Sequence, residues 1–256
     1  MDKPWLIVQY DNRHIQDEYV RLIDLNKQYC KRHDYEYMLE TTPYDMPPWW
    51  IKVKLVRDLL HTNRYKGVLW LDTDAVIHNH ALPIEKLLIQ GKSFYYCADC
   101  PVWTSEFNAG VWLVTNDTMG NTIMDTWINS YSPNDWTKKD NKWTSSGAWA
   151  GSTYEQGAFV KYVKPLFETS IYIYPWQVFQ SYEPENDTFS LHFAGELSET
   201  YLPKYNAHLY YPKLILYIIL CVFSLVSIVI VLYIVDSTYF HMIFSGRSYV
   251  RPTRLR

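Results

Sequence analysis

Two carboxylates follow a strongly apolar segment of the sequence. Asp72 and Asp74 stand two residues apart in WLDTDA, at the end of the apolar run 67–71. Such a run is typical of a strand buried on both faces of a sheet. Carboxylates spaced i, i+2 at its end can point to one side and share a hard divalent cation. The spacing predicts a site for Mn²⁺ or Mg²⁺ that can bridge a nucleotide diphosphate. The alternative is an acidic turn in solvent.

The segments around this pair alternate between strand and helix patterns. In the first part of the chain we expect strands at 5–9, 35–39 and 67–71 and helices at 15–33 and 49–64. Further on we expect strands at 93–98, 110–115 and 171–174 and helices at 118–130 and 154–162. This order predicts an α/β fold, an open sheet with helices on both faces, in which ligands bind at the carboxyl ends of strands.

One segment shows no period. Residues 130–151 contain turn-forming residues and three tryptophans but neither helical nor strand spacing. We interpret this segment as a long polar loop that acts as a binding lid, with disorder as the alternative.

Four motifs in order resemble a GT-A glycosyltransferase. They are GVLWLDTDAVIHN at 67–79, FNAGVWLV at 107–114, YEQGA at 154–158 and LHFAG at 191–195. They are similar to those of the fungal α-galactosyl- and α-mannosyltransferases and plant xyloglucan xylosyltransferases, and the glycogenin-like family shares several of them. The resemblance covers about residues 5–205. It implies a Rossmann-like, open mixed sheet and transfer of a hexose or pentose from a nucleotide-diphosphate sugar to a glycan or glycoprotein hydroxyl, with retention.

The resemblance also implies roles for single residues. Asp72, Asp74 and His192 of HFAG would hold Mn²⁺, and imidazole is a sensible partner for two carboxylates on this ion. The donor sugar nucleotide would be bound by the two aspartates together with Lys52 of WWIK, Asn108, Gly110 and Gly195. Gly110 would let the backbone approach the donor closely.

The catalytic candidates depart from the family pattern. Glu155 and Gln156 stand where the family has an acidic residue followed by Gln, near the anomeric carbon, but the usual pair is Asp-Gln. The longer Glu155 leaves open which of the two side chains faces the reaction. An inverting mechanism would instead need a general base, for which Asp99, Glu155 and Glu106 are the candidates.

Aromatic side chains are abundant, at 17% of all residues. Flat side chains with a polar edge suit the apolar faces of sugars. Candidates for contact with the acceptor are Trp103 and Trp149, and also Trp143 and Trp176. Tyr10, directly after the first strand, could stack on the nucleobase. Core packing is the alternative for each of these rings.

A long apolar run stands near the C-terminus. Residues 214–235 contain no charge, Pro, Asn or Gln, and as a helix they would span about 33 Å, enough for a bilayer. We therefore predict a glycosyltransferase domain at 1–205, a linker at 206–213, a transmembrane helix at 214–235 and a short basic tail at 236–256. The sequence starts without a signal-peptide pattern, which favours a cytosol-facing domain on a single-pass C-terminal anchor. The arginines of the tail favour the lumenal orientation instead.

Charge and composition exclude other classes of protein. Without the four arginines and one aspartate of residues 214–256, the chain has 20 basic and 26 acidic residues, so a basic face for nucleic acid is not expected. A nucleotidyltransferase that makes sugar nucleotides would have a Gly-rich loop after its first strand, whereas VQYDNRH has no glycine. A membrane-tethered glycan-binding module without catalysis would explain the tryptophans but not the aspartates.

Overall fold

The computed structural model describes residues 3–103 and 105–244. The chain divides into two compact units, Met1–Tyr205 and Asn206–Arg256. The first unit contains the strands and the shorter helices, and the second contains most of one long helix, α7, which runs from Leu197 to Phe244. All candidate site residues lie in the first unit.

Within the described residues, six strands form the main sheet of the first unit. They are β1 (Trp5–Tyr10), β2 (Glu36–Glu40), β3 (Gly67–Leu71), β5 (Phe94–Cys97), β6 (Val111–Thr115) and β9 (Ile171–Tyr174), in the spatial order β2-β1-β3-β6-β5-β9. β1 pairs in parallel with β2 and β3, and β9 pairs in parallel with β5. β6 is antiparallel to both of its neighbours. The expected α/β class with an open mixed sheet is confirmed.

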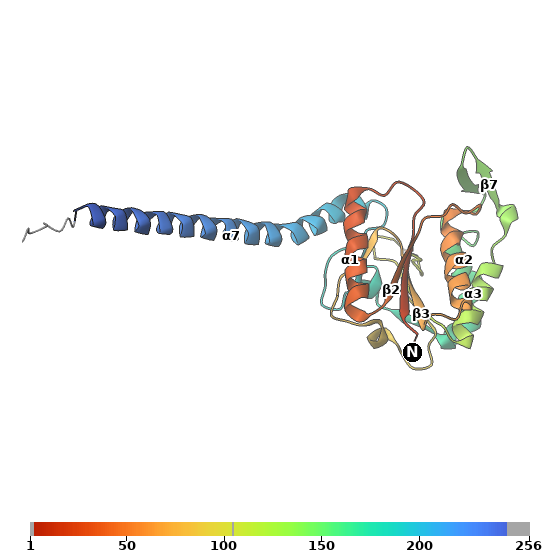
Figure 1. The fold of residues 1–256 in the computed structure, drawn as a ribbon. Helices are drawn as coiled ribbons and strands as arrows, with labels where there is room; N and C mark the ends of the chain where they lie inside the picture. Colours follow the sequence, from red (N-terminus) through yellow and green to blue (C-terminus); the bar gives the residue numbers. More distant parts are fainter. Residues whose placement is uncertain (1–2, 104, 245–256) are drawn as a thin grey trace, which may run out of the picture. The chain divides into compact units, whose positions relative to one another are not determined.

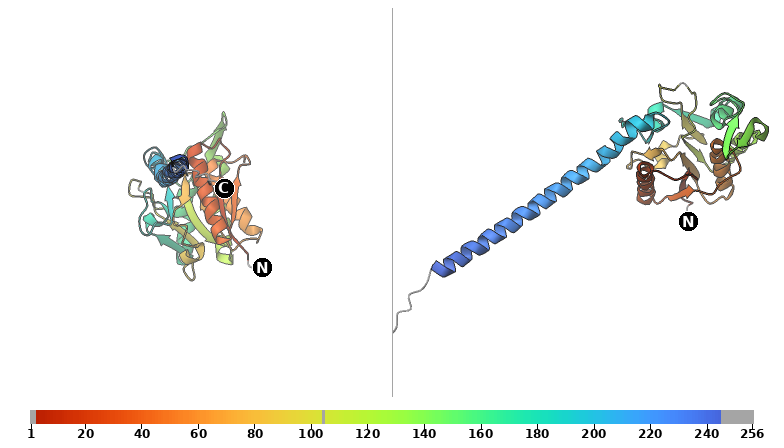
Figure 2. Two further views of the ribbon diagram at one scale, coloured as in Figure 1. Left: turned by 60° about the vertical axis from the view of Figure 1, so that its left-hand side comes forward. Right: turned by 90° about the horizontal axis from the view of Figure 1, so that it is seen from above.

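Helices cover both faces of this sheet (Figure 1). α1 (Asp17–His33) lies on one face, and α2 (Pro48–His61) and α3 (Thr118–Asn129) lie on the other. Side chains of a strand alternate between the two faces of the sheet, so each face has its own core. Ile7 packs with Tyr29 of α1 on one face. Leu6 and Val8 pack with residues of α2 and α3 on the other. Figure 2, seen from above, shows the same layers.

Short elements complete the first unit. They are β4 (Ala75–Ile77), η1 (Ile84–Leu87), η2 (Pro133–Asp135), β7 (Trp136–Lys139), β8 (Lys142–Ser145), α4 (Glu155–Ala158), a π-turn η3 (Phe159–Val163), α5 (Lys164–Phe167), η4 (Glu168–Ser170), α6 (Trp176–Phe179) and β10 (Ser190–His192). β10 pairs antiparallel with β4, and His192 lies opposite Ala75. This two-stranded ribbon therefore joins the end of the chain's first unit to the segment that follows the two aspartates.

The segment 130–151 differs from the expected loop. It contains the β-hairpin β7–β8, with Lys139 paired to Lys142. The turn residues Asp140 and Asn141 have φ angles of 50° and 59°, the left-handed conformation of tight hairpin turns that Asn and Asp tolerate best. Because the strands have only four residues each, the sequence offers too short an alternation to reveal them.

The prediction of a C-terminal membrane anchor is wrong. Across the described residues, no helix combines the length and the apolar character that a membrane crossing needs. Residues 214–235 form the middle of the 48-residue α7. The helix extends beyond this uncharged run at both ends, so the run is not a separate element. The predicted single-pass location and the predicted membrane contact depend on this anchor, so they are not supported either. In the predicted basic tail, residues 245–256 lie outside the described part of the chain.

Aromatic rings fill the core between the sheet and the α2–α3 layer. Phe94 lies at the centre of this cluster, and its ring is stacked on Trp112 and Phe159 with centroid distances of 5.3 and 4.8 Å. Trp127 and Phe107 approach the same ring edge-on. All five side chains are fully buried, so their apolar area contributes strongly to the stability of the fold.

We expect Phe94→Ala to destabilise the fold by about 3–5 kcal/mol, because it removes a buried ring and leaves a cavity that its neighbours cannot fill. Chemical denaturation followed by tryptophan fluorescence measures this loss. Leu166→Ala is the control, since that side chain is 67% exposed. Similar stability of the two variants would contradict the central place of Phe94 in the core.

Candidate active site

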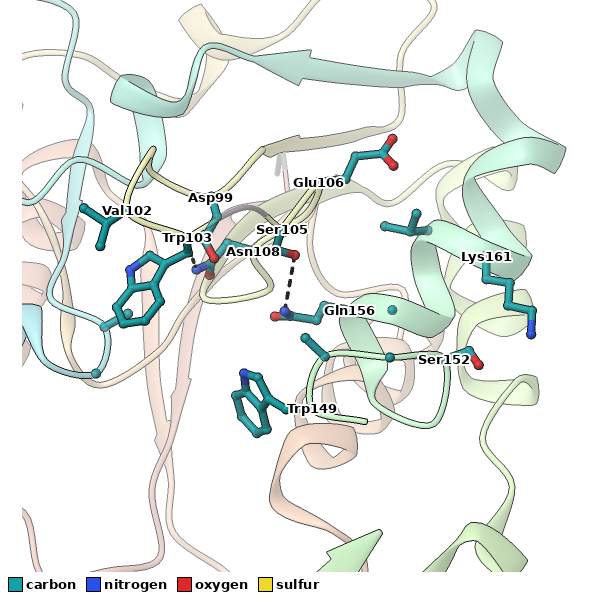
Figure 3. A pocket seen from close by; sticks show the side chains of 16 residues that line it. Asp99, Val102, Trp103, Ser105, Glu106, Asn108, Trp149, Ser152, Gln156 and Lys161 are labelled. Atoms are coloured by element: carbon teal, nitrogen blue, oxygen red, sulfur yellow. Dashed lines mark hydrogen bonds between the residues drawn. The ribbon is translucent and has the colours of Figure 1, made fainter. Parts of the chain in front are cut away.

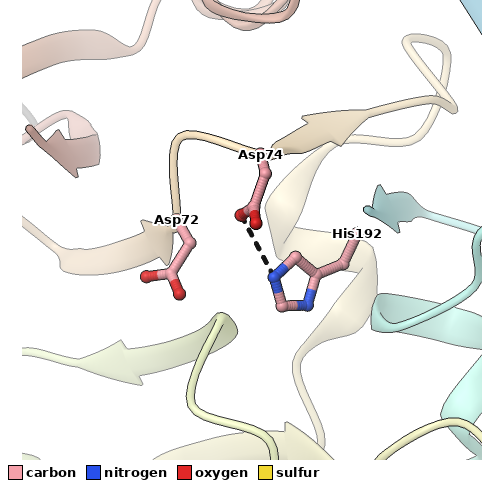
Figure 4. A group of neighbouring side chains, drawn as sticks. All are labelled: Asp72, Asp74 and His192. Carbon is pink, nitrogen blue, oxygen red and sulfur yellow. Dashed lines mark ion pairs between the residues drawn. The ribbon is translucent and has the colours of Figure 1, made fainter. Parts of the chain in front are cut away.

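Asp72, Asp74 and His192 converge at one end of the main sheet (Figure 4). One ligand atom from each of these side chains lies within 4.8 Å of the others. The Nε2 atom of His192 is 3.2 Å from Oδ1 of Asp74. This is the combination of oxygen and nitrogen donors that the sequence predicted from two distant motifs.

Two ladders of backbone hydrogen bonds bring these residues together. The β3–β6 ladder ends at the pair Leu71 and Val111, and the N–H of Asp72 then donates to the carbonyl of Gly110 at 2.7 Å. The β4–β10 ribbon brings His192 beside the segment that follows Asp74. The N–H of Phe193 donates to the backbone carbonyl of Asp74 at 3.0 Å. The site therefore lies where the main sheet meets the short ribbon.

Gly110 has no room for a side chain. A Cβ atom at this position would lie 2.1 Å from Cε1 of the His192 ring, far inside van der Waals contact. The N–H of Gly110 donates to Oδ1 of Asn108 at 2.8 Å, which fixes the turn before β6. The missing side chain thus makes space for the imidazole, and Gly110 also lines a small cavity beside it.

Lys52 and Trp70 hold the carboxylate of Asp72. Nζ of Lys52 lies 2.8 and 3.0 Å from its two oxygens, and Nε1 of Trp70 donates to Oδ1 at 2.8 Å. Lys52 also donates to the carbonyl of Ala109 at 3.1 Å and lies 3.7 Å from Oε1 of Glu155. Burial lowers the pKa of Lys52, but the two carboxylates outweigh it and the net pKa is raised. The lysine is therefore a charged group inside the site.

The three converging residues fit a divalent cation. Oδ1 of Asp74 is buried without a hydrogen bond of regular geometry, and its 3.2 Å contact with Nε2 of His192 is an ion pair only when the imidazole is protonated. Burial raises the pKa of Asp74, but the neighbouring His192 outweighs it and holds the pKa below its usual range. Burial likewise lowers the pKa of His192, and the carboxylates of Asp74 and Asp72 raise it above its usual range. Two carboxylates and an imidazole suit Mn²⁺ better than Mg²⁺, which prefers oxygen ligands.

Glu155 and Gln156 differ in their surroundings. Glu155 is 2% exposed, and its Oε2 atom has no hydrogen-bond partner. Burial raises its pKa to about 7, an effect that Lys52 partly offsets. Gln156 is half-buried, and its Nε2 lies 3.4 Å from the hydroxyl of Ser105. Gln156 is thus the more accessible of the two side chains.

A tyrosine-lined pocket lies on one side of the three converging residues. This tyrosine pocket has a volume of about 580 Å³, and its walls include Tyr10, Arg13, Lys52, Asp72 and Asp74. Arg13 is held by Asp11 through two hydrogen bonds of 2.8 and 2.9 Å. Tyr10 packs edge-on against Tyr44. A cation and an aromatic ring therefore stand on the wall of a cavity that reaches the carboxylates.

A second, larger pocket lies on the other side (Figure 3). This large pocket has a volume of about 830 Å³ and is lined by the indoles of Trp103 and Trp149 as well as by Asp99 and Gln156. Trp149 is 69% exposed. Burial raises the pKa of Asp99, and Asn108 donates to its Oδ1 atom at 2.8 Å.

A small central cavity connects the two pockets. It has a volume of about 150 Å³ and is lined by Asp72, Asp74 and His192 together with Asn108, Gly110, Glu155 and Gln156. It shares Trp49 and Lys52 with the tyrosine pocket, and Asn108, Trp149 and Gln156 with the large pocket. The three spaces therefore adjoin one another, and the candidate metal site lies on the wall of the smallest.

The remaining candidates lie in or near these spaces to different degrees. Gly195, expected at the donor, lines the large pocket beside Trp103, and its φ of 54° favours glycine. Among the described residues, the lining of these three spaces does not include Trp143 or Trp176. Trp143 lies under Lys138, and Trp176 is stacked on Tyr182. Glu106 lines the large pocket and forms an ion pair with Lys164.

Several residues of the site were not among the candidates predicted from the sequence. They are Arg13, Trp49 and Trp70 on the walls, Gln9, which donates to the carbonyl of Asp72 at 3.0 Å, and Gln180, which contacts His192. Trp49 and Trp70 stand in the quoted motifs WWIK and WLDTDA, so these motifs could have indicated them. Isolated glutamines carry no such signal.

Known proteins resemble this chain in part of its sequence and in its fold. Residues 6–98 match the galactosyl transferase GMA12/MNN10 family. No curated protein sequence matches the chain. A solved glycosyltransferase involved in the glycosylation of the major capsid of PBCV-1 has a TM-score of 0.58 with this chain, at 15% identity, over 77% of this chain and 96% of its own. The chain has a glycosyltransferase fold. The predicted resemblance to GT-A glycosyltransferases is confirmed, and WLDTDA lies within the matched residues.

Two further solved structures are similar over a large part of this chain. GlyE of Streptococcus pneumoniae TIGR4, a glycosyltransferase, is 15% identical over 76% of this chain and 56% of its own, with a TM-score of 0.44. A mutant of Drosophila β-1,4-galactosyltransferase 7, in complex with manganese, UDP-Gal and xylobiose, is 13% identical over 77% of this chain and 74% of its own, with the same TM-score.

We expect Gly110→Ala to weaken Mn²⁺ binding at least about tenfold, because the new methyl group would displace the His192 ring. Titration of the chain with Mn²⁺, followed by calorimetry, measures this. Gly120→Ala is the control, since its Cβ would meet the carbonyl of Thr115 at 2.0 Å, away from the cleft. Both variants should lose stability, but unchanged Mn²⁺ affinity in Gly110→Ala would contradict the assignment.

Proposed function

We propose that this chain is a metal-dependent glycosyltransferase that moves a sugar from a nucleotide-diphosphate sugar to a hydroxyl of a glycan or glycoprotein. The observation that carries the proposal is the position of Asp72, Asp74 and His192 between two larger pockets. A transferase needs two substrate sites that meet at one reacting centre. A binding module without catalysis would not need the second pocket or the converging carboxylates.

The tyrosine pocket suits the donor. Tyr10 can stack on the base, and Arg13 can contact a phosphate, because a guanidinium matches phosphate geometry. A Mn²⁺ ion held by Asp72, Asp74 and His192 would supply the positive charge that stabilises the departing diphosphate. Lys52 fixes the carboxylate of Asp72 before any substrate arrives, so this part of the site is already ordered.

The central cavity suits the transferred sugar. Gln156 reaches both this cavity and the large pocket, so its amide can hydrogen-bond the sugar at the reacting centre. Glu155 is buried behind it, beside Lys52. We propose transfer with retention, in line with the resemblance, in which these groups stabilise an oxocarbenium-like centre. Inversion would use Asp99 as the general base, since this carboxylate lines the large pocket and its pKa is raised. The anomeric configuration of the product, observed by NMR, distinguishes the two outcomes.

The large pocket suits the acceptor glycan. Its volume of about 830 Å³ exceeds that of the tyrosine pocket, and Trp103 and Trp149 present flat faces to it (Figure 3). Tryptophan faces pack well against the C–H faces of sugars. The Asp99 carboxylate and the Asn108 amide supply polar groups for the hydroxyls of the same sugars.

We expect Asp72→Asn and Asp74→Asn each to abolish transfer and Mn²⁺-dependent nucleotide binding while the fold is retained, because each removes a charged ligand of the ion. A thermal-shift screen against UDP-, GDP- and other nucleotide sugars with Mn²⁺ identifies a donor that raises the melting temperature. The transfer assay then uses that donor. Asp58→Asn, a surface carboxylate paired with Lys54, is the control. Full activity of either site variant, or of the wild type in excess chelator, would refute the mechanism.

We expect Trp149→Ala to raise the acceptor KM about 3- to 10-fold and the donor KM by a smaller factor, because this ring forms a wall of the large pocket and also reaches the central cavity. Steady-state kinetics with each substrate varied in turn separates the two constants. Trp176→Ala is the matched control, since this tryptophan is stacked on Tyr182. An equal rise of both constants in Trp149→Ala would contradict the assignment of the large pocket to the acceptor.

A further inference from the structure

The two ring nitrogens of His192 face different partners. Nε2 lies 3.2 Å from Asp74 and faces the three-residue cluster, whereas Nδ1 lies 2.6 Å from Oε1 of Gln180. Gln180 and His192 are 2% and 4% exposed, so no solvent competes for these contacts. None of the quoted motifs includes Gln180, which follows directly after α6.

Backbone carbonyls determine how the amide of Gln180 is oriented. Its Nε2 atom lies 3.3 Å from the carbonyl oxygen of Asn108 and 3.4 Å from that of Val111. Carbonyl oxygens only accept hydrogen bonds, so the NH₂ group must point toward them. The reversed amide would place its own oxygen against two other oxygens. Oε1 therefore faces His192, and because this oxygen is also only an acceptor, Nδ1 of the imidazole must donate.

This orientation decides which ring nitrogen can bind a metal ion. A neutral imidazole has one N–H and one lone pair, and the hydrogen bond of one nitrogen determines the state of the other. With the proton held on Nδ1, the lone pair is on Nε2, which faces Asp74 and Asp72. A neutral ring without this partner could place its proton on Nε2, where Asp74 would accept it, and its lone pair would then lie on Nδ1, away from Asp74.

We propose that Gln180 is a positioning residue that holds His192 in the tautomer and ring orientation required for metal binding through Nε2. The inference rests on the proposed metal-dependent function. Gln180 itself does not touch the ion or either substrate pocket. The same turn before β6 serves both residues, because Gly110 makes room for the ring and the carbonyls of Asn108 and Val111 orient the amide.

The test compares two substitutions of Gln180 in the full chain. Gln180→Met keeps the length of the side chain but removes the acceptor and both donors. Gln180→Glu keeps an acceptor for Nδ1, and as a buried, protonated acid it can donate to the carbonyls. Mn²⁺ is titrated into each variant without nucleotide sugar. We expect about 10- to 100-fold weaker binding for Gln180→Met and substantial recovery for Gln180→Glu.

A spectroscopic measurement separates positioning from general loss of structure. Electron spin-echo modulation of bound Mn²⁺ detects a directly coordinated imidazole nitrogen. We expect this signal in the wild type and in Gln180→Glu, and its loss in Gln180→Met. Ser190→Ala is the matched control, because the hydroxyl of Ser190 bonds the carbonyl of Phe179 and so links the same two segments without touching the ring. This control should keep both the affinity and the nitrogen signal.

The outcomes distinguish the inference from the function on which it rests. If Gln180→Met binds Mn²⁺ as tightly as the wild type and keeps the nitrogen signal, the positioning role is wrong and the proposed function stands. The positioning role is also wrong if Ser190→Ala weakens binding as much as Gln180→Met. If the wild type binds no Mn²⁺, with or without nucleotide sugar, the metal-dependent function fails and the inference fails with it.

Discussion

The close contact between Gly110 and the His192 ring is the constraint on which the site depends. It is possible only because residue 110 has no side chain. Around this contact, the backbone oxygens of the same turn are all engaged in building the site: Gln180 donates to those of Asn108 and Val111, Lys52 to that of Ala109, and the N–H of Asp72 to that of Gly110. One turn of backbone thus orients an imidazole, a carboxylate and an ammonium group relative to one another.

The sheet gives this turn its rigidity. Residues on either side of it are fixed by the β3–β6 ladder and by the aromatic cluster around Phe94, where every ring is buried. The β4–β10 ribbon then adds the remaining ligand from a part of the chain more than a hundred residues away. Because backbone ladders rather than long side chains bring these three side chains together, the candidate metal site is already ordered in the folded chain.

Most of the fold could be predicted from the sequence where patterns are long. The apolar run at β3 and the helical spacing of α1 and α2 are strong local signals, whereas the grouping of Asp72 and Asp74 with His192 was implied by the resemblance to GT-A glycosyltransferases. The hairpin β7–β8 was not predicted, because four-residue strands give too little alternation.

Other features of the chain could not be read in this way. Gln180 was not predicted because its role depends on two carbonyls that only folding brings near it. Composition alone misled at residues 214–235, where an uncharged run was taken as a complete element although it is the middle of α7. The local sequence therefore indicates which residue types a segment contains, whereas the ends of a helix and the contacts of a side chain depend on the rest of the fold.

The tryptophans on the walls of the cleft link its two ends. Trp49 lines the tyrosine pocket, Trp149 lines the large pocket, and their rings meet edge-to-face at a centroid distance of 5.7 Å. Trp49 is also stacked on Trp136 at the start of the hairpin β7–β8. The two indoles therefore form one aromatic wall that runs from the tyrosine pocket to the large pocket. Movement of either indole would therefore change the lining of both pockets.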